Sequence, residues 1–186
     1  MTELLHQLSF GLMILSAVVA AIVSIERIIF ASVNMRKAKQ LVTALDGDLQ
    51  AFPKLLGNDV VSQMVAKLLH DRGQGLESGQ RQDRADAAYL HARDELGSRL
   101  WILDTIVTAA PLMGLLGTIF GIVDTFLALS KSGMADPAGV SAGIGTALYA
   151  TALGISIALV GLMSFNYLSN RNERIGERLK MLILRL

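Results

Sequence analysis

Long apolar runs alternate with charged segments along this chain. No charged residue occurs in Leu8–Ile25, in Thr105–Val123 or in the much longer stretch Pro137–Asn170. A helix needs about 20 apolar residues to cross a bilayer. The pattern therefore predicts three transmembrane helices.

The segment between the first two apolar runs is patterned as helix. Apolar residues recur at helical spacing in Val33–Leu45, Leu49–Leu69 and Arg81–Leu100. Asp46-Gly47-Asp48 and the stretch Gly73–Gly79 separate these segments, and both are typical of loops. We expect the three segments to extend the membrane helices beyond the bilayer.

The end of the chain is amphipathic. Apolar residues fall on one face of an arginine-bearing helix at Ile175, Leu179, Leu182 and Leu186. Such a tail either packs on neighbouring helices or lies along the membrane surface. Packing is favoured because so much helix surrounds it.

Positive charge predicts the orientation. Of the 17 Lys and Arg residues, 16 lie between Arg27 and Arg99 or from Arg171 onward, and Met1–Gln7 has none. Positive residues concentrate on the cytoplasmic side, so we expect a periplasmic N-terminus and a cytoplasmic C-terminus. The N-terminal flank carries Glu3 and lacks the basic residues of an export signal, so we expect the first span to remain in the mature protein.

The predicted fold class is an all-α membrane protein in which cytoplasmic helices extend three transmembrane helices. The expected segments are the periplasmic N-terminus with the first span 1–32, a cytoplasmic helical domain 33–100, the second span 101–130, a periplasmic loop 131–137, the third span 138–170 and an amphipathic cytoplasmic tail 171–186. A composition of 52% hydrophobic and 18% charged residues agrees with a membrane protein.

Small residues recur in the second and third spans. The second span places Gly114, Gly117 and Gly121 at positions i, i+3 and i+7. The third span carries a longer stripe of small residues at Gly143, Ala147, Ala150, Gly154, Ala158 and Gly161. Small side chains let helix backbones approach closely in lipid, so these positions predict helix packing that also holds a homo-oligomer together.

Polar residues mark a second face of the second span. The set consists of Asp104, Thr108, Thr118 and Thr125. Each hydroxyl either bonds the carbonyl one turn back or contributes to a polar pathway, and both interpretations stay open. Pro111 removes the hydrogen bond to the carbonyl of Val107, so we expect a kink, with a neighbouring helix, water or the Thr108 hydroxyl satisfying that carbonyl.

Other chemistries are excluded or disfavoured. The chain has no cysteine, which excludes disulfides and thiolate sites. His6, His70 and His91 are isolated, so we expect solvated histidines and no metal site. No glycine-rich loop is followed by Lys-Ser or Lys-Thr, so we do not expect the chain to be an enzyme that hydrolyses nucleotides. We also expect no cofactor. Arg36, Lys37 and Lys39 are expected to meet lipid headgroups and not nucleic acid.

Three motifs carry a family resemblance. APLMGLLGTIFGI, at 110–122, resembles the APLLGLLGTVxGI signature of the ExbB/TolQ/MotA proton-channel family. ALYATALGI, at 147–155, resembles the third-span signature of that family, and Ser24-Ile25-Glu26-Arg27 is similar to the motif that closes its first span. The resemblance covers nearly the whole chain.

The resemblance implies a motor subunit in a bacterial inner membrane. Family members assemble as pentamers around a dimer of a single-span ExbD/TolR/MotB-like partner, whose membrane aspartate takes and releases the ion, in some cases with a TonB-like energy transducer. Thr118 and Thr151 match the threonines of the ion path. The alternative is a non-conducting membrane scaffold or signalling anchor with the same fold.

One position departs from the ExbB and TolQ pattern. Those branches carry a glutamate five residues before the third-span threonine, where this chain has Thr146. The flagellar MotA branch also lacks that acid, although the short chain looks more like ExbB and TolQ. The acid that carries the ion must then be Asp104, Asp124 or a residue of another chain. We expect the partner chain to supply it. Thr146 would lend a hydroxyl ligand at most. Such a hydroxyl is compatible with coordinating Na⁺, because hard cations take neutral oxygen ligands, and the sequence does not decide between H⁺ and Na⁺.

Overall fold

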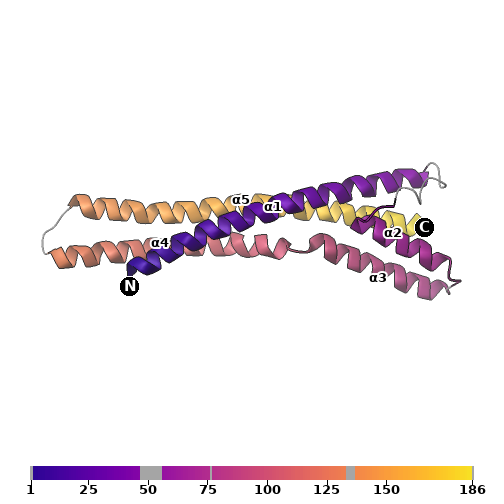
Figure 1. The fold of residues 1–186 in the computed structure, drawn as a ribbon, viewed down its shortest axis with the longest axis horizontal. Coiled ribbons are helices and arrows are strands. Elements are labelled where there is room, and N and C mark those ends of the chain that lie inside the picture. Colours follow the sequence, from indigo (N-terminus) through magenta and orange to yellow (C-terminus); the bar gives the residue numbers. More distant parts are fainter. Residues whose placement is uncertain (1, 47–55, 76, 133–136, 186) are drawn as a thin grey trace. The chain divides into compact units, whose positions relative to one another are not determined.

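The computed structural model is all-helical over the residues that it describes, which are 2–46, 56–75, 77–132 and 137–185. The helices in this part of the chain are α1 (Thr2–Asp46), α2 (Val60–Arg72), α3 (Ser78–Gly97), α4 (Leu100–Ser132) and α5 (Pro137–Arg185) (Figure 1). The expected all-α class is confirmed. The predicted orientation of the termini stays a prediction.

Three of the helices are long and apolar enough to cross a membrane. They contain the segments Gln7–Leu45, Leu100–Ser130 and Pro137–Arg185, with 39, 31 and 49 residues. A bilayer core needs only about 20 residues of helix, so each segment is longer than the span it provides. Only 22–28% of the most apolar window of each segment is buried within the chain. The remaining apolar surface requires lipid or other protein chains around it.

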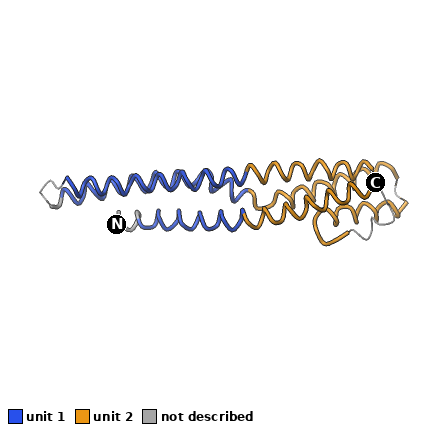
Figure 2. Tube along the Cα trace, turned by 90° about the horizontal axis from the view of Figure 1, so that it is seen from above, with its two compact units in different colours: residues 1–24, 101–165 blue, residues 25–100, 166–186 orange. Residues whose placement is uncertain are grey.

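The chain divides into two compact units (Figure 2). Unit 1 comprises Met1–Ser24 and Trp101–Phe165, and unit 2 comprises Ile25–Leu100 and Asn166–Leu186. Unit 1 contains most of the apolar sequence of the spans, whereas unit 2 contains most of the charged sequence. The domain boundaries predicted from the sequence remain predictions.

Some helix limits differ from the sequence analysis. Val33–Leu45 belongs to the uninterrupted α1, and α2 starts at Val60, so the predicted helix Leu49–Leu69 was wrong for residues 56–59. The reason is a cap: the Asp59 carboxylate accepts from the backbone N–H of Ser62 at 3.0 Å. Asp46 belongs to α1, and Lys131 and Ser132 belong to α4, so the loops predicted at 46–48 and from 131 were wrong for these three residues. Residues 47–48 and 133–136 of those loops lie outside the described residues.

Unit 2 has its own hydrophobic core. The amphipathic end of α5 contributes Ile175, Leu179 and Leu182, each with no exposed surface, to a cluster with Leu41 of α1 and Val61 of α2. Ala88, Ala92 and Leu96 of α3 complete the cluster. The tail therefore packs its apolar face on neighbouring helices, as favoured. Leu186 lies outside the described residues.

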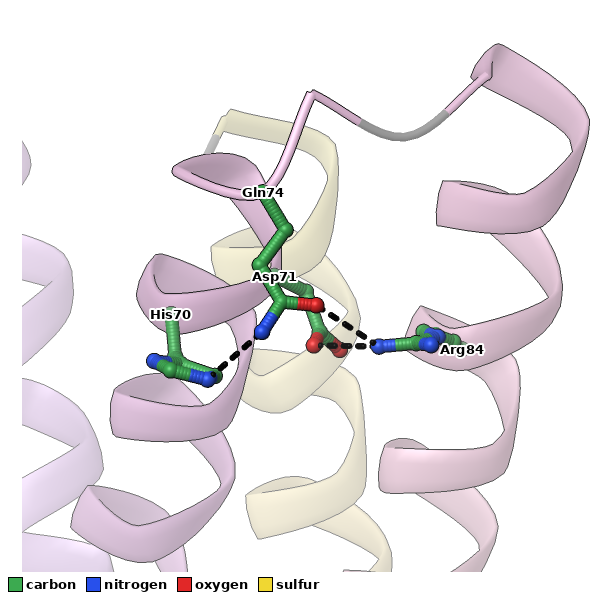
Figure 3. Close-up of polar contacts among 4 residues, drawn as sticks. All are labelled: His70, Asp71, Gln74 and Arg84. Carbon is green, nitrogen blue, oxygen red and sulfur yellow. Dashed lines mark hydrogen bonds and ion pairs between the residues drawn. The ribbon is translucent and has the colours of Figure 1, made fainter.

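A polar network joins α2 to α3 (Figure 3). Arg84 Nη1 donates to Asp71 Oδ1 at 2.9 Å and to Gln74 Oε1 at 3.3 Å, and the Gln74 amide lies 2.9 Å from the His70 ring. Asp71 is almost fully buried, whereas Arg84 is half exposed. The ion pair neutralises a carboxylate that would be costly to bury alone.

Candidate functional site

The centre of unit 1 is a close contact between α4 and α5. A Cβ atom added at Gly114 would lie 2.9 Å from the Ala150 carbonyl oxygen, and one added at Gly154 would lie 2.5 Å from the Ala110 carbonyl oxygen. Both obstacles are backbone atoms, which cannot rotate away. Glycine is therefore required at both positions for the two helix backbones to touch.

The other predicted packing glycines lie in different environments. A Cβ atom at Gly117 would lie 2.9 Å from the Ala150 side chain, and one at Gly143 would collide with the Thr125 side chain. Gly121 is half-buried, and its carbonyl accepts from the Thr125 hydroxyl at 2.8 Å. The contacts around Gly114, Gly117, Gly143 and Gly154 are within one chain, so these residues serve the subunit's own fold before any assembly.

Two threonines form a polar cluster beside this contact. The hydroxyls of Thr118 and Thr151 are hydrogen-bonded to each other across the two helices. The Gly114 carbonyl lies 3.2 Å from the Thr118 hydroxyl and 3.1 Å from that of Thr151, and the Ala147 carbonyl is 3.0 Å from Thr118. A methyl group at 114 would force the helices apart and disrupt these bonds. The structure thus brings together the two threonines that the family resemblance selected.

Thr146 does not join this cluster. It is exposed, and its hydroxyl donates to the Ala142 carbonyl one turn back at 3.0 Å. Five residues separate it from Thr151, which places it on a different side of α5. In this chain by itself, Thr146 satisfies its hydroxyl on its own helix.

The polar face predicted on α4 is split by its surroundings. Thr118 and Thr125 are half-buried and lie against α5, whereas Asp104 and Thr108 are exposed. No described hydrogen bond joins Asp104 or Asp124 to the threonine pair; Asp104 is exposed and Asp124 is half-buried. Among the described residues, no group of three His, Cys, Asp or Glu side chains has metal-binding geometry.

Pro111 lies inside α4, directly after the alanine whose carbonyl faces Gly154. The Thr108 hydroxyl is 2.9 Å from the Thr105 carbonyl and 3.2 Å from that of Asp104, so it is not directed at the Val107 carbonyl. The prediction that the Thr108 hydroxyl satisfies the Val107 carbonyl was therefore wrong. A neighbouring helix or water is left as the partner of that carbonyl. The kink at Pro111 stays a prediction.

Sequence reasoning missed a polar junction in unit 2. Arg27, only 5% exposed, donates to the Ser98 hydroxyl at 2.9 Å and lies over the Phe30 ring. Arg99 adopts a left-handed φ of 65° and donates to Glu26 at 2.5 Å. The turn between α3 and α4 is thus held by both charged residues of the Glu26-Arg27 motif. Gly97-Ser98 was the available turn signal.

Comparison with known proteins finds a family that matches most of the chain and relatives that match part of it. A profile described as the MotA/TolQ/ExbB proton channel family matches residues 57–181. The "Biopolymer transport protein ExbB" of Aquifex aeolicus is 39% identical over 74 residues, covering 40% of this chain and 50% of that protein. That of Helicobacter pylori is 35% identical over 88 residues, covering 47% and 61%.

A second branch of the family is also similar. The "Tol-Pal system protein TolQ" of Haemophilus influenzae is 40% identical over 84 residues, which cover 45% of this chain and 37% of that protein. The matches therefore span between about a third and two thirds of the length of these curated relatives.

Proposed function

Because this chain belongs to the MotA/TolQ/ExbB proton channel family, we propose that it is a subunit of an ion-driven motor in the bacterial inner membrane. The motor would convert a flow of protons or sodium ions into mechanical work for transport or envelope processes. The names of the relatives, biopolymer transport and Tol-Pal system proteins, support that class of work. The three long apolar helices support the membrane location.

The proposed assembly is a pentamer around a dimer of a single-span ExbD/TolR-like partner, with a TonB-like energy transducer where the cargo requires one. Apolar side chains such as Leu116, Ile119 and Leu159 are about half exposed on the spans, so surface is available for neighbouring chains and lipid. Among the described residues of the third span there is no carboxylate. In the second span, Asp104 is exposed, Asp124 is half-buried, and no described hydrogen bond joins either to the threonine pair. The ion-carrying acid is therefore assigned to the partner.

The observation that carries the proposal is the bonded pair of Thr118 and Thr151. Two hydroxyls and two backbone carbonyls gather where α4 and α5 touch, in a segment otherwise made of apolar and small side chains. Hydroxyl and carbonyl oxygens are the groups that replace an ion's hydration shell in pores. The pair is assigned to the ion path, and exposed Thr146 lends at most one further hydroxyl.

Thr118→Val and Thr151→Val test this assignment, because valine preserves the shape and deletes the hydroxyl. Proton uptake would be measured in proteoliposomes that contain the chain with its single-span partner. Thr105→Val is the matched control, since the hydroxyl of this exposed threonine of α4 bonds only the Trp101 carbonyl among the described contacts, at 2.8 Å. We expect assembly to survive in all three variants, with flux lost in the first two alone.

Full proton flux in both Thr118→Val and Thr151→Val would favour the alternative function. In that alternative the chain is a non-conducting scaffold or signalling anchor, and the two threonines only join its own helices. One observation supports that alternative: the hydroxyls of Thr118 and Thr151 both already make hydrogen bonds within the chain. A second comparison sets Thr146→Ala against loss of the partner's membrane aspartate, under separate H⁺ and Na⁺ gradients. We expect a modest loss from the first change and abolition from the second.

A further inference from the structure

A cavity between α1 and α5 has a cationic lining. It encloses about 230 Å³ and is bounded by Met35, Tyr167, Asn170, Arg171 and Arg174. All five residues belong to unit 2. None of these five described residues is acidic, so the cavity offers guanidinium, amide and phenol groups without a countercharge in its own lining.

Charge is segregated around this part of α5. Arg171, Arg174 and Arg178 stand at positions i, i+3 and i+7, which share one helix face. This face meets α1, since Arg178 Nη1 lies 2.6 Å from the Met35 sulfur. Glu173 and Glu177 line a different cavity, against α3. The acids of α5 are therefore turned away from the cationic cavity.

The guanidinium groups of this face retain unused hydrogen-bonding capacity. Arg171 Nη1 donates to the Tyr167 hydroxyl at 2.7 Å, but Arg171 Nε is buried without an acceptor. The acceptor of Arg178 is a thioether, which is weak. Neither of the ion pairs found in the described part of the chain involves these arginines. An anion with several oxygens would satisfy these donors.

The cavity also lies at the end of the uncharged sequence of α5. Arg171 is the first charged residue after the uncharged stretch Pro137–Asn170, and Arg36-Lys37 follow Met35 directly on α1. Tyr167, which is 48% exposed, is the kind of residue found at membrane–water interfaces. The first charges beyond a membrane span are expected at the depth of the lipid headgroups, whichever way the chain is oriented.

We propose that this cavity binds the phosphate of an anionic phospholipid headgroup. Arg171 and Arg174 bind the phosphate oxygens, and Tyr167 positions the Arg171 guanidinium through its hydroxyl. The headgroup's remaining hydroxyls face the Asn170 amide. A free phosphate ester offers the same anion, but only a lipid also places acyl chains beside the exposed apolar surface of the neighbouring spans. The site is independent of the proposed ion path.

Native mass spectrometry of the purified assembly in detergent tests the proposal. The probes are phosphatidylglycerol, phosphatidylcholine and soluble glycerol 3-phosphate, titrated separately. We expect phosphatidylglycerol to bind at least about tenfold more tightly than either of the others, because only it combines net negative charge with acyl chains.

Arg174→Gln removes one phosphate ligand, and Arg185→Gln is its control. Arg185 lies on the same face of α5, 11 residues further on and outside the cavity lining. We expect Arg174→Gln to weaken phosphatidylglycerol binding about five- to tenfold, in line with one arginine at a membrane surface, and Arg185→Gln to change it less than twofold. Arg174→Lys keeps the charge without the bidentate fork and should fall between them.

Three results would overturn the proposal. An equal loss in Arg174→Gln and Arg185→Gln would mean diffuse attraction to the membrane and no built site. Glycerol 3-phosphate binding as tightly as phosphatidylglycerol would identify a soluble phosphate ester as the ligand. Dissociation of the assembly by Arg174→Gln, with lipid binding unchanged, would assign the basic face to contact with a second copy of the chain.

Discussion

Adding one methyl group at the α4–α5 contact should destabilise the protein measurably. In Gly154→Ala the new Cβ atom would lie 2.5 Å from the Ala110 carbonyl oxygen and 3.1 Å from the Gly114 Cα atom. Carbon atoms pack best about 3.5–4.0 Å apart, so the helices must separate by about 0.5–1 Å. Overpacking of this kind costs about 1–3 kcal/mol.

Two further terms adjust this cost. Separation of the helices stretches the 3.1 Å hydrogen bond from Thr151 to the Gly114 carbonyl, and an interhelical bond in a membrane protein contributes about 0.6 kcal/mol. Alanine is a better helix former than glycine by up to about 1 kcal/mol, which acts in the opposite direction. We expect a net loss of about 1–3 kcal/mol in the free energy of unfolding.

Gly145→Ala is a matched control. It makes the same exchange on the same helix, but apart from the neighbouring backbone of α5 itself no heavy atom lies within 4 Å of the added Cβ atom. It should be neutral or stabilising by up to about 1 kcal/mol. Unfolding would be followed by far-UV circular dichroism during titration of mixed micelles with SDS, with the oligomeric state checked by gel filtration. If the two variants differ by less than about 0.5 kcal/mol, the backbone contact is not what requires glycine at 154.

The remaining predictions concern topology and unit 2. A reporter active only in the periplasm should work when fused before Thr2 or within 132–136 and be silent after Leu186; activity at the C-terminus would contradict the predicted orientation. Leu179→Ala should lower the free energy of unfolding by about 2–5 kcal/mol, because Leu179 has no exposed surface. Leu184→Ala is the control: this side chain is 85% exposed, so its loss should cost under about 0.5 kcal/mol. Equal effects of the two changes would contradict the packing of the tail in the core. Arg84→Gln should lower the free energy of unfolding by about 1–2 kcal/mol, because it leaves the buried Asp71 carboxylate unpaired. Arg81→Gln, at an exposed arginine of α3, should lower it little in the same denaturation assay. Equal losses in the two variants would argue against a stabilising role of the Arg84–Asp71 pair.

The apolar spans, the small-residue positions and the packed tail were all readable from the sequence. A bilayer imposes length and polarity on each crossing segment separately, so an uncharged stretch such as Leu8–Ile25 reports a span without reference to other residues. The amphipathic repeat of Ile175, Leu179 and Leu182 likewise reports a buried face from spacing alone. Thr118 and Thr151 were selected by family resemblance, which did not predict their mutual hydrogen bond.

Only the tertiary structure decided which residues meet. It pairs Gly114 with Gly154 inside one chain, where the sequence suggested contacts that also hold an oligomer, and it joins Arg27 to Ser98 across 71 residues. It also separates Thr146 from the threonine pair and turns Arg171 and Arg174 toward α1, away from the acids of the same helix. A repeat of small or charged residues defines a helix face, but its partner depends on the rotation and register of two packed helices. Those are set by all the side chains at the contact together, and no single segment contains them.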